Sequence, residues 1–108
     1  MGGANPEVIP MLREFRRRVA KKFGIERMIL FGSQVTDRRR KDSDIDLLIV
    51  SKRKRKLSLL SKLYHEWHIV QEIGYPVDFV CYTPEEFEVL RKRVTIVREA
   101  LRERVEIA

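Results

Sequence analysis

The chain has 108 residues, 44% of them hydrophobic and 36% charged, and it carries a formal net charge of +7 at pH 7. This length predicts a single compact domain over residues 1–108 and excludes a multidomain assembly, while the apolar content argues against global disorder. Because no apolar run approaches the roughly 20 residues that cross a bilayer, and the first residues lack the features of a signal peptide, we expect a cytoplasmic protein with no membrane contact.

Basic residues are concentrated in the first half of the chain, since residues 1–56 hold 16 of the 23 Lys and Arg residues but 7 of the 16 Asp and Glu residues. Two basic runs, residues 38–41 and 52–56, flank an apolar segment. Either these runs steer phosphates or a polyanion toward that segment, or they form a solvated, ion-paired surface. Aromatic residues are not interleaved with them, so nucleic-acid binding is a secondary prediction.

The first predicted element is a helix that is capped at Asn5 and ends at Gly24. Its candidate first-turn prolines are Pro6 and Pro10, and its apolar stripe comprises Ile9, Leu12, Val19 and Phe23. Residues 26–31 form a short apolar run, which predicts a core strand. This strand leads directly into a turn at Gly32 and Ser33.

Two aspartates, Asp44 and Asp46, lie at the start of a second predicted strand, residues 42–51. Side chains alternate along a strand, so the two carboxylates point to one face while Ile45 and Leu47 point to the other. Two carboxylates on one face repel each other unless a cation neutralises them. Mg²⁺ commonly binds one or two carboxylates and completes its coordination with water and substrate phosphates. The pair therefore predicts a metal-dependent phosphoryl-transfer site.

A second helix is predicted over residues 57–73, ending at Gly74 and covering one face of the sheet. Its apolar stripe comprises Leu60, Leu63, Tyr64, Trp67, Val70 and Ile73. His65 and His68 lie three residues apart, but no neighbouring Cys or carboxylate pattern completes a zinc site. We therefore expect both histidines to be surface or core-edge residues, and the aromatic residues of the stripe to pack in the core.

A third strand is predicted over residues 77–82, with the single carboxylate Asp78 embedded near its start. Cys81 is the only cysteine of the chain, which excludes an internal disulfide. Its place in an apolar run predicts a small buried side chain rather than a nucleophile.

The last part of the chain begins with a helix that is capped at Thr83, has a capping-box Glu86 and runs to about Arg91. The pattern then predicts a short helix near residues 96–101 and a brief strand at 105–107. This order of elements predicts an α/β or α+β fold, with a small mixed sheet and helices packed mainly on one face. The strand order cannot be read from the pattern.

The Gly32-Ser33 pair, the Asp44 and Asp46 pair that begins twelve residues after Gly32, and Asp78 on a later strand together resemble the DNA polymerase beta-like nucleotidyltransferase superfamily. The resemblance is to its minimal nucleotidyltransferase (MNT) branch in particular, and it covers nearly the whole chain. It implies that Gly32 and Ser33 contact nucleotide phosphates. It also implies that Asp44, Asp46 and Asp78 are the catalytic acids and hold two Mg²⁺ ions.

The activity implied by this resemblance is transfer of a nucleoside monophosphate, AMP from ATP or its equivalent from another nucleoside triphosphate, to an acceptor hydroxyl with release of pyrophosphate. One ion, held by all three acids, would activate the acceptor hydroxyl, and the other, held by Asp44 and Asp46, would neutralise the triphosphate. Asp78 is the candidate acceptor of the hydroxyl proton. The resemblance also implies a HEPN-domain toxin as partner, with this chain as the antitoxin that AMPylates a tyrosine on it.

Two alternatives stay open at the level of sequence. Where members of the superfamily often have a small residue, an arginine and a glycine, this chain has residues 35–37, Val-Thr-Asp, which is compatible with a catalytically weak antitoxin that acts by occluding its partner. An RNA-nucleotide-adding enzyme would instead use the basic runs as a track for the nucleic-acid backbone. The acceptor, the base preference and the oligomeric state, a homo-oligomer included, are not determined by the sequence.

Overall fold

A computed structural model describes residues 7–32, 44–52, 56–93 and 104–108. These residues form four strands and three α-helices, the second of which continues into a π-helix. The elements are α1 (Val8–Phe23), β1 (Ile25–Phe31), β2 (Ile45–Ser51), α2 (Lys56–His65), η2 (Glu66–Val70), β3 (Val77–Tyr82), α3 (Pro84–Lys92) and β4 (Val105–Glu106). Several predictions lie outside the described residues, namely those on Asn5, Pro6, Ser33, residues 35–37, the basic run 38–41, most of the run 52–56 and the helix at 96–101.

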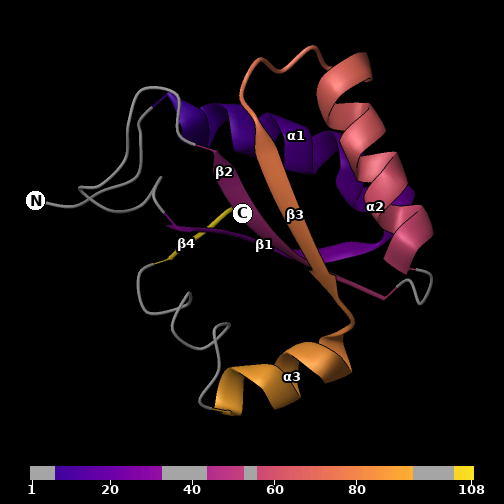
Figure 1. The fold of residues 1–108 in the computed structure, drawn as a ribbon, viewed down its shortest axis with the longest axis vertical. Coiled ribbons are helices and arrows are strands. Elements are labelled where there is room, and N and C mark those ends of the chain that lie inside the picture. Colours follow the sequence, from indigo (N-terminus) through magenta and orange to yellow (C-terminus); the bar gives the residue numbers. More distant parts are fainter. Residues whose placement is uncertain (1–6, 33–43, 53–55, 94–103) are drawn as a thin grey trace, which may run out of the picture.

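The four strands form one mixed sheet in the order β3-β2-β1-β4 (Figure 1). β1 pairs antiparallel with both β2 and β4, whereas β2 and β3 are parallel and are connected through α2. A parallel pair needs such a crossover, because its strands start at the same edge of the sheet. The predicted mixed sheet is therefore confirmed.

The helices cover the two faces of the sheet unequally. α1 and α2 pack on one face, where alternate residues such as Leu30, Leu47 and Phe79 belong to the main core. α3 lies on the opposite face, where Phe87 packs against the smaller cluster of Ile29, Leu48 and Val50. The expectation of helices packed mainly on one face is thus confirmed, with α3 as the one described helix on the other face. Because β2 is covered on both faces in its second half, its residues there are continuously apolar.

An aromatic cluster forms the centre of the main core. The ring centroid of Phe15 on α1 lies 5.0 Å from that of Trp67 and 5.9 Å from that of Phe79. α1 ends as predicted at Gly24, whose φ of 62° is the left-handed conformation that glycine adopts without strain. Its first turn begins at Val8, with Glu7 preceding it.

The second helix departs from its prediction, because regular α-helix ends at His65 and a π-helix runs to Val70. The Gln71 N–H donates to the Glu66 carbonyl at 2.9 Å, which is the i to i+5 bond of a π-helix. The left-handed residue after it is Glu72, with a φ of 52°, rather than the expected Gly74. The reason is tertiary: Trp67 stays fully buried, and its indole N–H donates to the Tyr75 carbonyl at 2.8 Å.

The other local predictions agree with the structure. Thr83 and Glu86 form a capping box at the start of α3, with Thr83 Oγ1 accepting from the Glu86 N–H at 3.2 Å. Cys81 is buried, and both predicted surface histidines are exposed. The terminal strand forms as β4. Within the described residues, no helix combines the length and the apolar character that crossing a membrane requires.

Candidate active site

Asp46 and Asp78 lie side by side near the starts of two neighbouring parallel strands, because the register of β2 and β3 pairs these residues. Adjacent strands are about 4.8 Å apart, so the two side chains emerge close together. Both point away from α1 and α2, since their neighbours along the strands are buried in the main core, namely Ile45, Leu47, Val77 and Phe79. Asp44 directly precedes β2 and is exposed.

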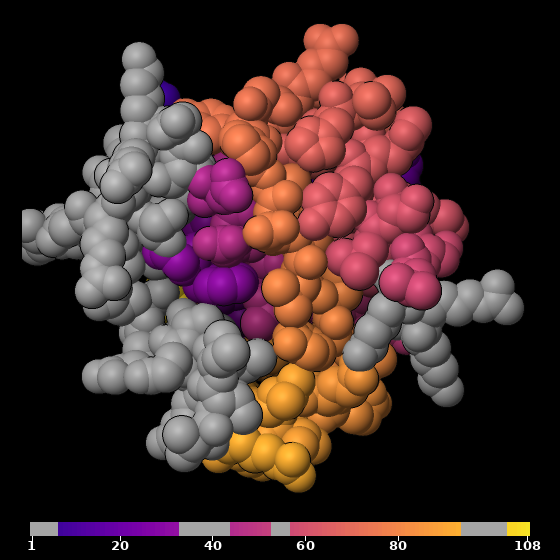
Figure 2. All heavy atoms as spheres, viewed as in Figure 1, coloured from indigo at the N-terminus to yellow at the C-terminus, as the bar shows by residue number. Residues whose placement is uncertain are grey.

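The uncovered part of this face results from the position of α3. Phe87 contacts Leu48 and Val50, in the second half of β2, so α3 covers the end of the sheet face away from the aspartates. Figure 2 looks onto this face, where side chains of β2 and β3 reach the surface next to one another and α1 lies almost wholly behind them. The acidic ends of both strands are therefore accessible to a ligand.

Gly32 brings the end of β1 against the aspartates. β1 and β2 pair so that Phe31 is opposite Asp46, and Gly32 follows with a φ of 78°. A Cβ atom at position 32 would lie 2.2 Å from Oδ2 of Asp46, which is closer than any real contact. Glycine is favoured here by its backbone conformation, and any larger residue would also force the Asp46 carboxylate to move. Ser33, the second predicted phosphate-binding residue, is outside the described residues.

Among the described residues, the charges that act on Asp46 are those of other carboxylates. Burial raises the pKa of the half-buried Asp46 carboxyl, and the negative charges of Asp78 and Asp44 raise this pKa further. No basic side chain of the described residues acts on Asp46 to lower its pKa. Asp78 and Asp44 are therefore each close enough to Asp46 to repel its charge.

The donor set fits a hard divalent cation, although no complete metal site is formed. In the described part of the chain, no three His, Cys, Asp or Glu side chains are grouped closely enough to hold an ion by themselves. Mg²⁺ does not require such a cage, because it commonly takes one or two carboxylates and fills its other positions with water and phosphate oxygens. Asp44 and Asp78 are exposed, so their oxygens can turn toward an ion that also contacts Asp46.

A pocket beside the acidic edge was not predicted from the sequence. It has a volume of about 900 Å³ and is lined by Met11 and by residues 71–76. The Ile45 N–H donates to the Pro76 carbonyl at 2.9 Å, which joins the pocket wall to the residue that follows Asp44. The pocket was not expected because residues 71–73, which line it, were predicted to be part of the second helix, whereas the helix ends at Val70.

Comparison with known proteins agrees with a phosphoryl-transfer site at these aspartates. A family model described as nucleotidyltransferase domain matches residues 12–106. This match includes Gly32 and all three aspartates. A search of curated proteins found no match to the chain.

Proposed function

Because the chain belongs to the nucleotidyltransferase domain family, which is matched over residues 12–106, we propose that it transfers AMP from ATP to an acceptor hydroxyl. Its four-stranded mixed sheet and three α-helices are the fold of the polymerase beta-like nucleotidyltransferases. The observation that supports the proposal is the pairing of Asp46 with Asp78 on neighbouring strands next to Gly32, with Asp44 directly before β2.

In the proposed reaction, the acceptor oxygen forms a bond to the α-phosphorus of ATP while the bond from that phosphorus to the leaving pyrophosphate breaks. Asp44, Asp46 and Asp78 would hold two Mg²⁺ ions, which when bound neutralise phosphate charge and make the acceptor hydroxyl more acidic. Asp78 is exposed beside Asp46 and accepts the hydroxyl proton. Gly32 has no side chain to keep the triphosphate away from the backbone at the end of β1.

We also propose that the acceptor is a hydroxyl on a partner protein, a HEPN-domain toxin, so that this chain acts as its antitoxin. The partner class comes from the resemblance to minimal nucleotidyltransferases. The pocket at residues 71–76 supports a protein acceptor, because it adjoins the acidic edge and is lined mainly by Met11, Ile73, Tyr75 and Pro76 rather than by cations. Ile69 and Val70, just before it in the chain, are 64% and 50% exposed.

The test is transfer of label from ATP labelled in its α-phosphate to a co-purified partner, with and without Mg²⁺. An Asp44→Asn, Asp46→Asn double variant should lose at least about 10³-fold in rate, as expected when groups that stabilise transition-state charge are removed. The matched control is Glu26→Gln, which removes one exposed carboxylate of β1 outside the site and should leave the rate unchanged.

Normal Mg²⁺-dependent transfer by the double variant would overturn the assignment of the acids. If the wild-type protein transfers no label, but both it and the double variant bind and inhibit the partner equally, inhibition by occlusion is the function instead. Labelling of co-purified RNA rather than protein would replace the proposed acceptor class.

A further inference from the structure

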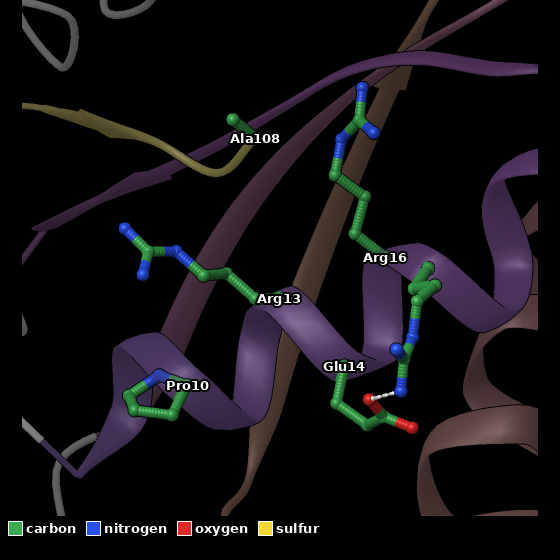
Figure 3. Close-up of a pocket in the computed structure, with 6 residues that line it drawn as sticks. Pro10, Arg13, Glu14, Arg16 and Ala108 are labelled. Atoms are coloured by element: carbon green, nitrogen blue, oxygen red, sulfur yellow. Dashed lines mark hydrogen bonds and ion pairs between the residues drawn. The ribbon is translucent and has the colours of Figure 1, made fainter.

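A second surface with the properties of a ligand site lies on the side of the sheet that α1 covers. It is a groove of about 510 Å³ between α1 and the last residue of the chain, Ala108 (Figure 3). The groove is lined by Pro10, Arg13, Glu14, Arg16, Arg17 and Ala108. The aspartates of the candidate active site are on the opposite face of the sheet, so the two surfaces are separate.

The positive charge of this groove is only partly compensated. Its one acidic side chain, Glu14, is engaged by Arg17 and by Arg18, whose Nε donates to Oε1 at 3.2 Å. The hydrogen bond from Arg18 and the charges of both arginines lower the pKa of Glu14 below its usual value, as expected for a carboxylate already neutralised. In Figure 3, Arg13 and Arg16 extend from α1 toward the side where Ala108 lies, whereas the Glu14 carboxylate lies on the other side.

Arg13 and Arg16 have spare capacity to bind an anion. Within the described residues, Arg13 makes no hydrogen bond or ion pair, and Arg16 makes one hydrogen bond, from Nη2 to the Glu26 carbonyl at 3.2 Å. The Nε of Arg16 is buried and has no partner among these residues. Arg16 also interacts electrostatically with the carboxylate of Glu106, which is already bound at two atoms by Arg27.

The positive surface continues along α1 beyond the groove. Lys21 is exposed, has no partner among the described residues, and follows Arg13 and Arg17 at steps of four. At 1.5 Å per residue, Arg13 and Lys21 are separated by about 12 Å along the helix axis, which is longer than a single phosphate group. Guanidinium groups match the geometry of phosphate oxygens, and a row of cations matches successive phosphates of one backbone.

We propose that this surface, made by Arg13, Arg16 and Lys21, binds the phosphodiester backbone of a nucleic-acid duplex. The contact is independent of base sequence, since no aromatic side chain among the groove residues offers a surface on which a base could stack. It lies outside the basic runs 38–41 and 52–56, which were the candidates from the sequence. The proposal does not depend on the transferase activity, because the active-site acids take no part in it.

The experiment measures fluorescence anisotropy of a labelled DNA duplex of about 20 base pairs over a series of salt concentrations, in EDTA so that no divalent ion bridges the duplex to the aspartates. An Arg13→Glu, Lys21→Glu double variant should bind at least about tenfold more weakly than the wild type. Its slope of log K against log salt should be less negative by about 1.8, since each lost phosphate contact removes about 0.9.

The matched control is a Lys62→Glu, Arg93→Glu double variant at exposed positions on α2 and just after α3, which introduces the same charge change away from the groove and should alter binding less than about threefold. Thermal unfolding of each variant checks that the fold is retained. Equal weakening by the control would show a general effect of net charge and overturn the proposal, as would unchanged binding by the double variant. Displacement of the duplex by glycerol 3-phosphate at the same phosphate concentration would show a site for a single phosphate instead.

Discussion

Gly32 is the residue whose identity is most narrowly fixed by its neighbours. A Gly32→Ala substitution would place a Cβ 2.2 Å from Oδ2 of Asp46, in a backbone conformation with a φ of 78°. Left-handed backbone costs a residue with a Cβ about 1–2 kcal/mol, and the Asp46 carboxylate would also have to move to make room for the Cβ. We expect a loss of about 2 kcal/mol in the free energy of unfolding and a large loss of nucleotidyl transfer, measured by urea denaturation and by label transfer.

Gly74→Ala provides the matched control for this substitution. A Cβ at position 74 would meet no atom within 4 Å, and its φ lies outside the left-handed range. We therefore expect its stability to change by less than about 0.5 kcal/mol. If both alanine variants behave alike, the contact between Gly32 and Asp46 does not constrain the site.

Asp46 makes the stability depend on pH in a direction opposite to that of most acids. Its pKa is raised in the folded protein by burial and by Asp78 and Asp44, so the folded state holds the proton more tightly than the unfolded state. Ionisation therefore favours unfolding, and the stabilising contribution of the protonated acid is present at low pH and lost as the pH rises through the raised pKa.

An Asp46→Asn variant should consequently be more stable than the wild type at pH 7 without divalent ions. We expect the gain to be less than about 1 kcal/mol, because the carboxylate is half exposed and solvent screens its interactions. The gain should disappear below about pH 3, where the acid is protonated in both states. Urea denaturation from pH 3 to 8 measures it, and a variant that is less stable at pH 7 would contradict the sign argued here.

How far the sequence predicted these residues depends on the range of the interactions involved. The common face of Asp44 and Asp46 follows from strand alternation, which is local. The contact of Gly32 with Asp46 could not be predicted, because it depends on the antiparallel register between β1 and β2. The pairing of Asp46 with Asp78 likewise depends on β2 and β3 being parallel neighbours, which no local pattern predicts. The family resemblance implied that these acids share a site, but it did not give the strand order.

At the scale of elements, the predictions succeeded where particular residues in the sequence mark the end of a helix. They failed where contacts between distant parts of the chain set that end. Gly24 and the Thr83 capping box mark their helix ends directly in the sequence. The apolar stripe of the second helix continues to Ile73, so nothing in its periodicity indicates the π-helix. Burial of Trp67 and the ion pair of Glu66 with Lys22 at 3.0 Å fix that turn instead, and both are contacts between distant parts of the chain.

The cap of α3 is expected to contribute measurably to stability, because Thr83 satisfies the otherwise unpaired N–H of Glu86. A Thr83→Ala substitution should lower the free energy of unfolding by about 1 kcal/mol in urea denaturation. Thr83→Ser keeps the hydroxyl oxygen and should retain most of that energy. If the serine variant loses as much as the alanine variant, the side-chain hydrogen bond is not the source of the effect.

At the scale of the whole molecule, the sheet separates the face that carries most of the core from the face that carries the candidate site. The face under α1 and α2 holds the aromatic cluster and most of the core, whereas the face under α3 has only a small cluster and leaves the aspartates open. Tyr64 on α2 also accepts a hydrogen bond from the Phe79 N–H at 3.2 Å, which occupies a donor on the outer edge of β3. This division lets the site carry unneutralised charge while stability is supplied from the other side.

A substitution at Phe15 tests whether the core under α1 and α2 supplies most of the stability. Phe15 is fully buried, and its ring contacts both Trp67 and Phe79. A Phe15→Ala substitution should cost about 3–5 kcal/mol, a large part of the 5–15 kcal/mol by which a domain of this size is stable. Phe15→Leu, which fills more of the cavity, should cost less than half as much. The measurement is urea denaturation followed by tryptophan fluorescence, with Trp67 as the only tryptophan. A cost below about 1 kcal/mol for the alanine variant would mean that the core is not centred on this cluster.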